Sequence, residues 1–125
     1  MARKKSPNLT EAEFRLMKIL WESGEATVSE VVGRLPADPP LAYTTVLTTL
    51  RILEAKGYVK HTKEGRAFVY APAVGQQEES RKVIRHLIRR FFSGSPGQLV
   101  LKLLEDEKIP PAELERIKKK IKEAE

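Results

Sequence analysis

The fold is decided by one stretch of the 125-residue chain, residues 42–56, which reads AYTTVLTTLRILEAK and is followed by Gly57. The stretch contains no proline or glycine, and Val46, Leu50 and Leu53 follow one another at steps of four and three residues. That spacing predicts a helix with one apolar stripe facing a core. Glycine is the residue that most often ends a helix in the left-handed conformation, so we expect the helix to end at Gly57.

Two shorter helices are predicted before this stretch, each from a capping box. Thr10 with Glu13, and Thr27 with Glu30, have the spacing at which the two side chains bind each other's backbone amides at a helix start. The second helix is expected to stop at Pro36. For the first helix we expect an apolar face made of Phe14, Met17, Leu20 and Trp21.

A β-hairpin is predicted directly after the stretch. Residues 58–62 and 67–71 are rich in β-branched and aromatic side chains, and the polar segment 63–66 between them contains a glycine. Three helices followed by a hairpin is the order of a winged helix-turn-helix, in which the third helix enters the major groove of DNA. The predicted fold class is therefore mainly α with a small β-hairpin wing, and residues 1–74 form the winged helix-turn-helix domain.

The outward face of the third helix carries hydrogen-bonding side chains and no acid. These side chains suit phosphates and base edges, and a threonine methyl can also contact a thymine methyl. Threonine is a mediocre helix former, so its abundance here is unusual for an unconstrained surface. The alternative is a threonine-rich exposed face without a ligand. The candidate base-reading residues are Tyr43, Thr44, Thr45, Thr48 and Arg51.

Basic residues elsewhere are candidates for contacts with the DNA backbone. The net charge of +6 and the pI near 9.7 suit a polyanionic partner, although net charge concerns association and not fold. The predicted wing carries Lys60, Lys63 and Arg66, and the N-terminal segment carries Lys5. Both groups of cations could instead serve only to keep the protein in solution.

Beyond residue 75 the helical period returns, which predicts a helical dimerisation domain over residues 75–125. Its helices are expected at about 76–92, after Ser95-Pro96 and after Pro110-Pro111. They carry more apolar side chains than one small winged domain can cover, and exposed apolar patches usually mark an interface. The alternative is that these helices fold back on their own winged domain. The candidate dimerisation residues are Ile84, Leu87, Ile88, Phe91, Leu99, Leu103, Ile117 and Ile121.

The composition argues against several other classes of protein. The chain has no cysteine, which excludes disulfides and thiolate metal sites, and its two histidines, His61 and His86, lie far apart. We therefore expect no metal, no cofactor and no enzymatic activity, since no catalytic constellation is apparent. No apolar run is long enough to span a bilayer and no secretory signal is recognisable, so we expect no membrane partner and a cytoplasmic protein.

The chain resembles the penicillinase-repressor family (BlaI/MecI/CopY type) over nearly its whole length. The resemblance lies in residues 9–13, 19–21, 43–50 and 53–59, which read LTEAE, ILW, YTTVLTTL and LEAKGYV. It implies a winged-helix transcriptional repressor that dimerises through C-terminal helices and binds double-stranded operator DNA of dyad symmetry. The positions carried over to this chain are Tyr43, Thr44, Thr45, Thr48 and Arg51.

The resemblance leaves the inducing signal open. In the lactam-responsive branch, a membrane sensor protease leads to cleavage of the repressor at an Asn-Phe bond, and here the matching segment 101–104 contains Lys102-Leu103 instead. The copper-responsive branch binds metal through cysteine pairs, which this chain lacks. A sensor protease or antirepressor therefore stays an unidentified possible partner.

Two other functions are compatible with the same sequence. A winged helix can serve as a protein-interaction module without DNA readout, because fold alone does not determine function. A repressor with a small ligand in its helical half is a third reading. A gel shift in rising salt separates the first from a DNA binder, since phosphate contacts weaken steeply as salt increases.

Overall fold

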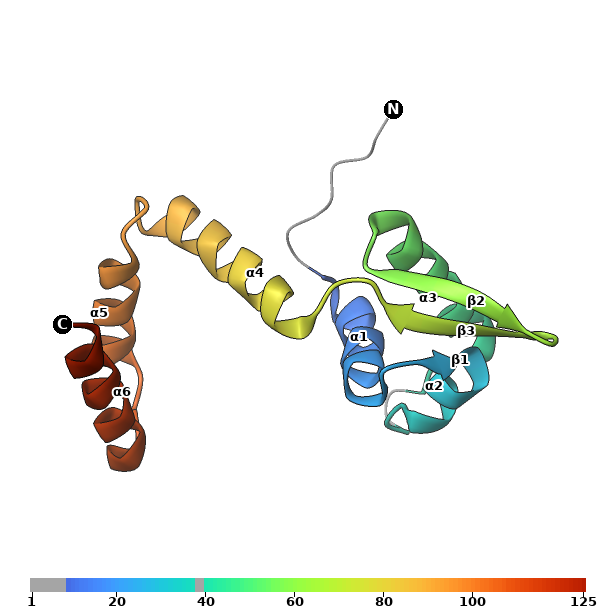
Figure 1. Cartoon of the computed structure of the whole chain (residues 1–125), viewed down its shortest axis with the longest axis horizontal. Helices are drawn as coiled ribbons and strands as arrows, with labels where there is room; N and C mark the ends of the chain where they lie inside the picture. Colours follow the sequence, from blue (N-terminus) through green and yellow to red (C-terminus); the bar gives the residue numbers. More distant parts are fainter. Residues whose placement is uncertain (1–8, 38–39) are drawn as a thin grey trace. The chain divides into compact units, whose positions relative to one another are not determined.

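The structure, a computed structural model, describes residues 9–37 and 40–125. The chain divides into two compact units, Met1–Ile84 and Arg85–Glu125. This boundary lies inside a helix, whereas the predicted domains meet at residues 74 and 75. The elements in chain order are α1 (Glu11–Ser23), β1 (Ala26–Thr27), α2 (Val28–Arg34), α3 (Tyr43–Lys56), β2 (Val59–Glu64), β3 (Ala67–Pro72), α4 (Gln76–Phe91), α5 (Pro96–Asp106) and α6 (Pro111–Ala124) (Figure 1).

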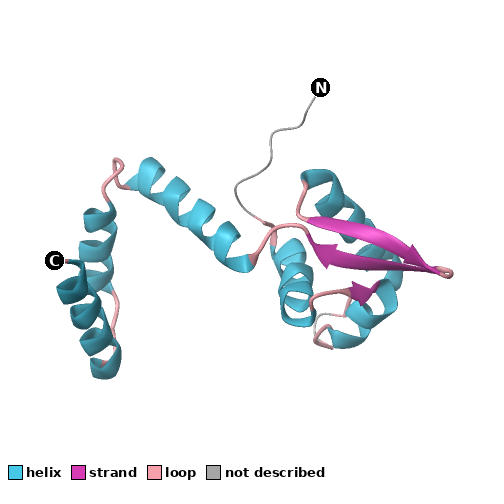
Figure 2. Cartoon of the chain, viewed as in Figure 1, coloured by secondary structure: helices cyan, strands magenta, loops and turns pink. Residues whose placement is uncertain are grey.

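The first unit contains the predicted three helices and hairpin. The helices α1, α2 and α3 contact one another, and the strands lie against them as the wing (Figure 2). The predicted fold class, mainly α with a small hairpin wing, is confirmed. The short strand β1 was not predicted; it adds to the hairpin, so that the antiparallel sheet has the order β1-β3-β2.

Both predicted capping boxes are present. At the start of α1, Glu13 N donates to Thr10 Oγ1 over 3.1 Å and Thr10 N donates to Glu13 Oε1 over 2.9 Å. The same exchange between Thr27 and Glu30 starts α2, and α1 ends at Gly24, whose φ is +84°. Local sequence signals therefore mark where the first two helices begin.

The core lies between the three helices and the sheet. Its stripe on α3 is the predicted one, since Val46, Leu50 and Leu53 are fully buried and Gly57 ends the helix with φ +89°. The predicted apolar face of α1 needs a correction, because Phe14 is 40% exposed and Leu16 takes a buried place instead. The other buried apolar side chains are Met17, Leu20, Ala26, Val28, Val31, Tyr58, Val59, Val69 and Tyr70.

The turn of the hairpin fixes which residues face each other across the wing. Glu64 pairs with Ala67, so the turn contains only Gly65 and Arg66, and Gly65 has a φ of +60°. A glycine at the first of two central positions is typical of a type II′ turn, whose twist matches that of the strands. The resulting register places His61 opposite Tyr70.

The second unit consists of the end of α4, the helices α5 and α6 and the short segments that join them. Ser95 begins α5 by accepting a hydrogen bond from Gln98 N over 3.2 Å, and Pro96 occupies the first turn, as predicted. The structure describes every residue of Arg85–Glu125, and none of them is buried. None of the helices in the described part of the chain has the length and apolar composition of a membrane-spanning segment.

Candidate nucleic-acid interface

The five candidate base-reading residues all lie on the exposed side of α3. Tyr43, Thr44, Thr45, Thr48 and Arg51 are exposed, while the stripe on the other side of the helix is fully buried. The fold therefore presents them together. Their hydroxyl and guanidinium groups are of the kind that bind phosphates and base edges.

The N-terminus of α3 differs from those of α1 and α2. Its N-cap is Ala42, no side chain in the described part of the chain caps it, and its first turn contains no acid. The first backbone amides of a helix lack partners inside the helix, and the macrodipole adds partial positive charge there. The start of α3 thus offers hydrogen-bond donors and positive potential next to Tyr43, which favours an anionic partner at this end of the face.

Arg51 lies beside a side chain from the wing. Its guanidinium lies close enough to the Tyr70 hydroxyl to act on the pKa of that phenol, and Tyr70 is buried. The pKa of Tyr70 is raised, chiefly by burial and further by the charge of Glu54, while Arg51 opposes the shift. Because its pKa is raised, the phenol stays protonated and neutral beside the charged guanidinium.

A second contact joins the end of α3 to the wing. The Nδ1 atom of His61 on β2 lies 2.7 Å from each carboxylate oxygen of Glu54. The His61 ring also packs against Phe68 and Tyr70, with ring centroids 5.4 Å apart in both pairs. Glu54 is the one acid of α3, and this contact directs it at the wing. His61 thus holds the Glu54 carboxylate against the wing.

Sequence patterns missed the contributions of Tyr70, Glu54 and His61. The position of His61 could have been predicted from the sequence. A two-residue turn at Gly65-Arg66 fixes the register of the hairpin, and that register places His61 opposite Tyr70. The contact of Arg51 with Tyr70 depends on how the helix packs on the sheet. No local pattern reports that packing.

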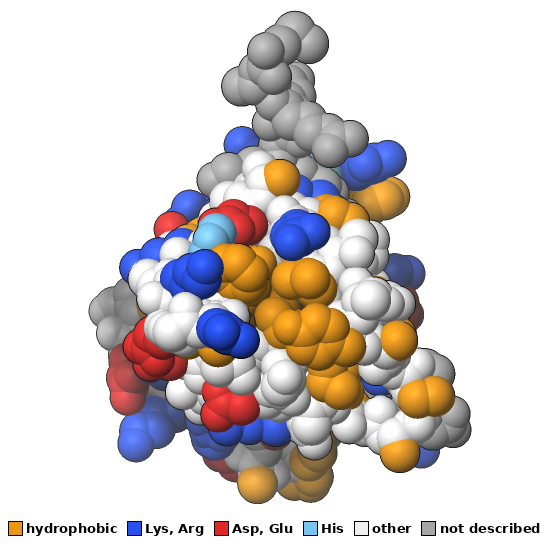
Figure 3. All heavy atoms as spheres, turned by 90° about the vertical axis from the view of Figure 1, so that its right-hand side faces the viewer, with side chains coloured by type: hydrophobic (Ala, Val, Ile, Leu, Met, Phe, Trp, Pro, Cys, Tyr) orange, Lys and Arg blue, Asp and Glu red, His pale blue; other side chains and the backbone are white. Residues whose placement is uncertain are grey.

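The wing carries the three predicted cations. Lys60, Lys63 and Arg66 are all exposed, and Lys63 Nζ lies 5.8 Å from the centroid of the Phe68 ring. Viewed from the side of the hairpin tip, lysine and arginine side chains border a group of apolar side chains (Figure 3). Such a surface combines cations for phosphates with apolar groups for sugars and methyl groups. Lys5 lies outside the described residues.

The candidate dimerisation residues divide between the two units. Ile84 belongs to the first unit and is 47% exposed. The others belong to the second unit, where Leu87, Phe91, Leu103 and Ile121 are exposed and Ile88, Leu99 and Ile117 are half-buried. An apolar set without a buried member has no core of its own. Across residues 9–37 and 40–125, no three His, Asp or Glu side chains are grouped as a metal site would require.

The arrangement of the first unit defines the class of protein. Three helices with an exposed acid-free face on the third, followed by a two-stranded wing, make a winged helix-turn-helix. The family model described as "Penicillinase repressor" matches residues 9–123. The chain belongs to the penicillinase-repressor family, and it is a DNA-binding transcriptional repressor of the winged-helix type.

Individual relatives agree with this assignment. The penicillinase repressor of Bacillus licheniformis is 30% identical over 114 residues, which cover 91% of this chain and 89% of the relative. The methicillin resistance regulatory protein MecI of Staphylococcus aureus is 23% identical over 91% of this chain and 93% of its own length. The solution structure of the DNA-binding domain of the repressor BlaI is 34% identical, with a TM-score of 0.53, and covers 61% of this chain and 93% of that domain.

Proposed function

We propose that the protein represses transcription as a homodimer bound to a pseudo-palindromic operator, with α3 of each copy in the major groove. The observation that carries this proposal is the exposed, acid-free face of α3 opposite a fully buried stripe. In the groove, Thr44, Thr48 and Arg51 contact base edges, together with Tyr43 and Thr45. Arginine reads guanine through a bidentate contact, and Arg51 lies beside Tyr70 of the wing.

Backbone contacts supply most of the affinity in this proposal. The uncapped amides at the start of α3 bind one phosphate, and the wing cations Lys60, Lys63 and Arg66 bind others. Lys5 is assigned the same role. These contacts fix the position of the protein on the duplex and carry no base information.

Dimerisation is assigned to the second unit. Its apolar side chains have no core within the unit, and a second copy of the same surface would cover them in a twofold interface. Such a dimer presents two copies of α3 to half-sites about 34 Å apart, one turn of the double helix. The dimer therefore accounts for a pseudo-palindromic operator. The proposed interface consists of these residues together with Ile84 at the end of the first unit: Ile84, Leu87, Ile88, Phe91, Leu99, Leu103, Ile117 and Ile121.

The division between base reading and backbone binding is tested by three variants on an operator selected from random duplexes. Arg51→Ala is expected to cost about 1–3 kcal/mol on the operator and to relax specificity, as is expected of a lost base contact. Lys63→Ala should weaken operator and random DNA equally and reduce the salt slope by about one. Lys18→Ala, an exposed cation on α1, is the matched control and should change neither.

Two outcomes would overturn the proposal. Equal losses for Arg51→Ala on operator and random duplexes would mean that α3 reads no sequence. Failure to retain any duplex at low salt would instead favour a protein-docking module, since phosphate contacts are strongest there. In this proposal the protein acts in the cytoplasm, catalyses no reaction and binds no cofactor.

A further inference from the structure

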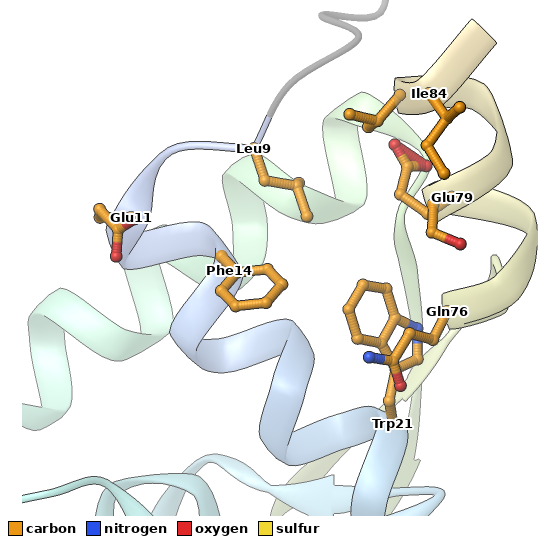
Figure 4. A pocket seen from close by; sticks show the side chains of 9 residues that line it. Leu9, Glu11, Phe14, Trp21, Gln76, Glu79 and Ile84 are labelled. Atoms are coloured by element: carbon orange, nitrogen blue, oxygen red, sulfur yellow. The ribbon is translucent and has the colours of Figure 1, made fainter. Parts of the chain in front are cut away.

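A groove of about 540 Å³ lies within the first unit, between α1 and the first turns of α4 (Figure 4). Its apolar walls are formed by Leu9, Phe14, Trp21, Val83 and Ile84. The charged side chains among the described residues that line it are Glu11 and Glu79, and no lysine or arginine is among them. The groove is therefore apolar with an acidic character, and it lies apart from the outward face of α3.

Glu79 is an unusual group in this groove because it is a buried carboxylate with one unsatisfied oxygen. The residue is 4% exposed, and its Oε1 accepts a hydrogen bond from Tyr58 Oη over 3.1 Å. Its Oε2 has no hydrogen-bond partner among the described residues. Buried polar atoms are nearly always paired, and leaving one unpaired costs free energy. Glu79 lines the groove on the α4 side, and its carboxylate is directed toward the part of the helix that carries Ile84 (Figure 4).

Among the residues that the structure describes, no lysine, arginine or histidine forms an ion pair with this carboxylate. Burial and the neighbouring Glu79 carboxylate raise the pKa of Tyr58 to about 12, so the phenol stays a neutral donor. Lys56, two residues before Tyr58, has its Nζ 2.7 Å from Glu13 Oε2 and is thus paired with another acid. A positively charged hydrogen-bond donor in the groove would balance the charge of the Glu79 carboxylate and would also donate to its unpaired oxygen.

The aromatic walls suit the same kind of ligand. The rings of Phe14 and Trp21 are in an edge-to-face arrangement with centroids 6.3 Å apart. Trp21 is fixed in place, since its Nε1 donates to the Val74 carbonyl oxygen over 2.9 Å. Phe14 is 40% exposed and leaves its ring available. Aromatic faces attract cations and also provide apolar contact.

We propose that this groove binds a small organic cation, an amine whose ammonium group donates to Glu79 Oε2 and whose apolar body lies against Phe14, Trp21 and Ile84. A neutral apolar molecule would leave Oε2 without a partner, and an anion would be repelled by Glu79 and Glu11. The proposal concerns binding of a ligand in the first unit and does not depend on DNA recognition.

The test uses the full chain, with 2-phenylethylamine as the probe. Trp21 is the single tryptophan of the chain and lines the groove, so its fluorescence reports occupancy directly. The matched neutral and anionic probes are 2-phenylethanol and phenylacetate. We expect the amine to bind about tenfold more tightly than the alcohol, because its hydrogen bond is charge-assisted, and phenylacetate not to bind.

Glu79→Gln is expected to remove most of the preference for the amine over the alcohol. Glu78→Gln is its matched control, since Glu78 is exposed on the same helix and does not line the groove. A second pair covers the case in which Glu79→Gln destabilises the fold. Ser80→Phe adds bulk at an exposed position that lines the groove, and Gln77→Phe adds the same bulk at an exposed position that does not.

The expected result for this second pair is loss of amine binding in Ser80→Phe and unchanged binding in Gln77→Phe. The proposal is overturned if the amine does not bind the wild-type chain, or if amine and alcohol bind equally. It is also overturned if a folded Ser80→Phe protein retains the affinity of the wild type. Because no DNA is present, none of these results bears on operator recognition.

Discussion

The two units of the chain use the same amphipathic pattern with different results. In Met1–Ile84 the apolar stripes of three helices and the sheet cover one another and produce a fully buried core. In Arg85–Glu125 the helices have clear apolar faces, yet no residue is buried. An apolar stripe therefore indicates that a helix packs against another surface, but it does not indicate which element or which chain provides that surface. The first unit contains its partner surfaces, and the second does not.

The largest effect is expected from damage to the core of the first unit. Leu50 is fully buried on α3, and Leu50→Ala removes its contacts with the rest of the core. We expect the free energy of unfolding of this unit to fall by about 2–5 kcal/mol, through lost apolar burial and the cavity left behind. Urea unfolding followed by Trp21 fluorescence measures this unit selectively, because the chain has one tryptophan.

The matched control is Leu101→Ala, which shortens a 58% exposed leucine on α5. It should leave the Trp21 transition unchanged. A shift as large as that of Leu50→Ala would mean that the second unit contributes to the first unit's stability, and the contrast between the units would fail.

The next effect concerns the second unit and its missing core. Phe91 is 68% exposed on α4, and the proposed interface would bury it in the dimer. Phe91→Glu is expected to weaken the dimer by about 2 kcal/mol or more, as is typical of a central aromatic residue in an interface. Sedimentation velocity over a range of concentrations measures the dissociation constant.

The control for Phe91→Glu introduces the same charge at a polar site. Gln77→Glu lies on the same helix at an exposed position in the first unit. It should leave the dimer intact. If the wild-type chain is monomeric at all concentrations, the apolar faces of the second unit are not joined by a second copy.

The same contrast explains which features were predictable from the sequence. Capping boxes at Thr10 and Thr27, the buried stripe of α3 and its end at Gly57 depend on neighbours within one helix, and all were predicted. The exposed face of α3 followed from the stripe by helical geometry. These features lie within a few residues of the signals that encode them.

Features that depend on packing between elements were missed. Phe14 has the spacing of a core residue, but α1 is rotated so that Leu16 is buried instead. The short strand β1 exists only because Ala26 and Thr27 lie beside β3 and pair with Tyr70 and Val69. The burial of Glu79 with Tyr58 likewise joins two elements far apart in the chain. Sequence periodicity carries no information on such distant contacts.

A smaller effect is expected from the ion pair inside the first unit. Glu13 is 4% exposed, and its carboxylate binds Lys56. Burial raises the pKa of Glu13, but the hydrogen bonds and charge of Lys56 and the bonds to Thr10 lower it more, to below the usual 4.5. A lowered pKa stabilises the fold above the unfolded value of 4.5, and this stabilisation is lost as the pH falls through the folded pKa.

Glu13→Gln isolates this contribution. At neutral pH it should cost about 1–3 kcal/mol, because the partly buried Lys56 loses its charged partner. The difference from the wild type should shrink below pH 4.5, where the wild-type carboxyl also becomes protonated. Urea unfolding at several pH values, followed by Trp21 fluorescence, checks both statements. A difference that is constant with pH would show that the charge of Glu13 is not what stabilises the unit.

The smallest effect compares helix caps in the two units. Thr27 caps α2 by a reciprocal exchange with Glu30, over 2.8 and 3.1 Å, whereas Ser95 caps α5 through one bond from Gln98 N. We expect Thr27→Ala to lower the stability of the first unit by about 1 kcal/mol, since the loss of a cap leaves helix amides unpaired. Ser29→Ala changes an exposed serine in the first turn of the same helix and is the control.

Ser95→Ala should act on the second unit alone. Because Arg85–Glu125 has no core of its own, the lost cap should appear as a weaker dimer and not as a shift in the Trp21 transition. The two caps thus report on different equilibria, unfolding of the first unit and association of the second. If Ser95→Ala shifts the Trp21 transition as much as Thr27→Ala does, the units unfold together. The helices of the second unit would then be stabilised by the first unit of the same chain and not by a second copy.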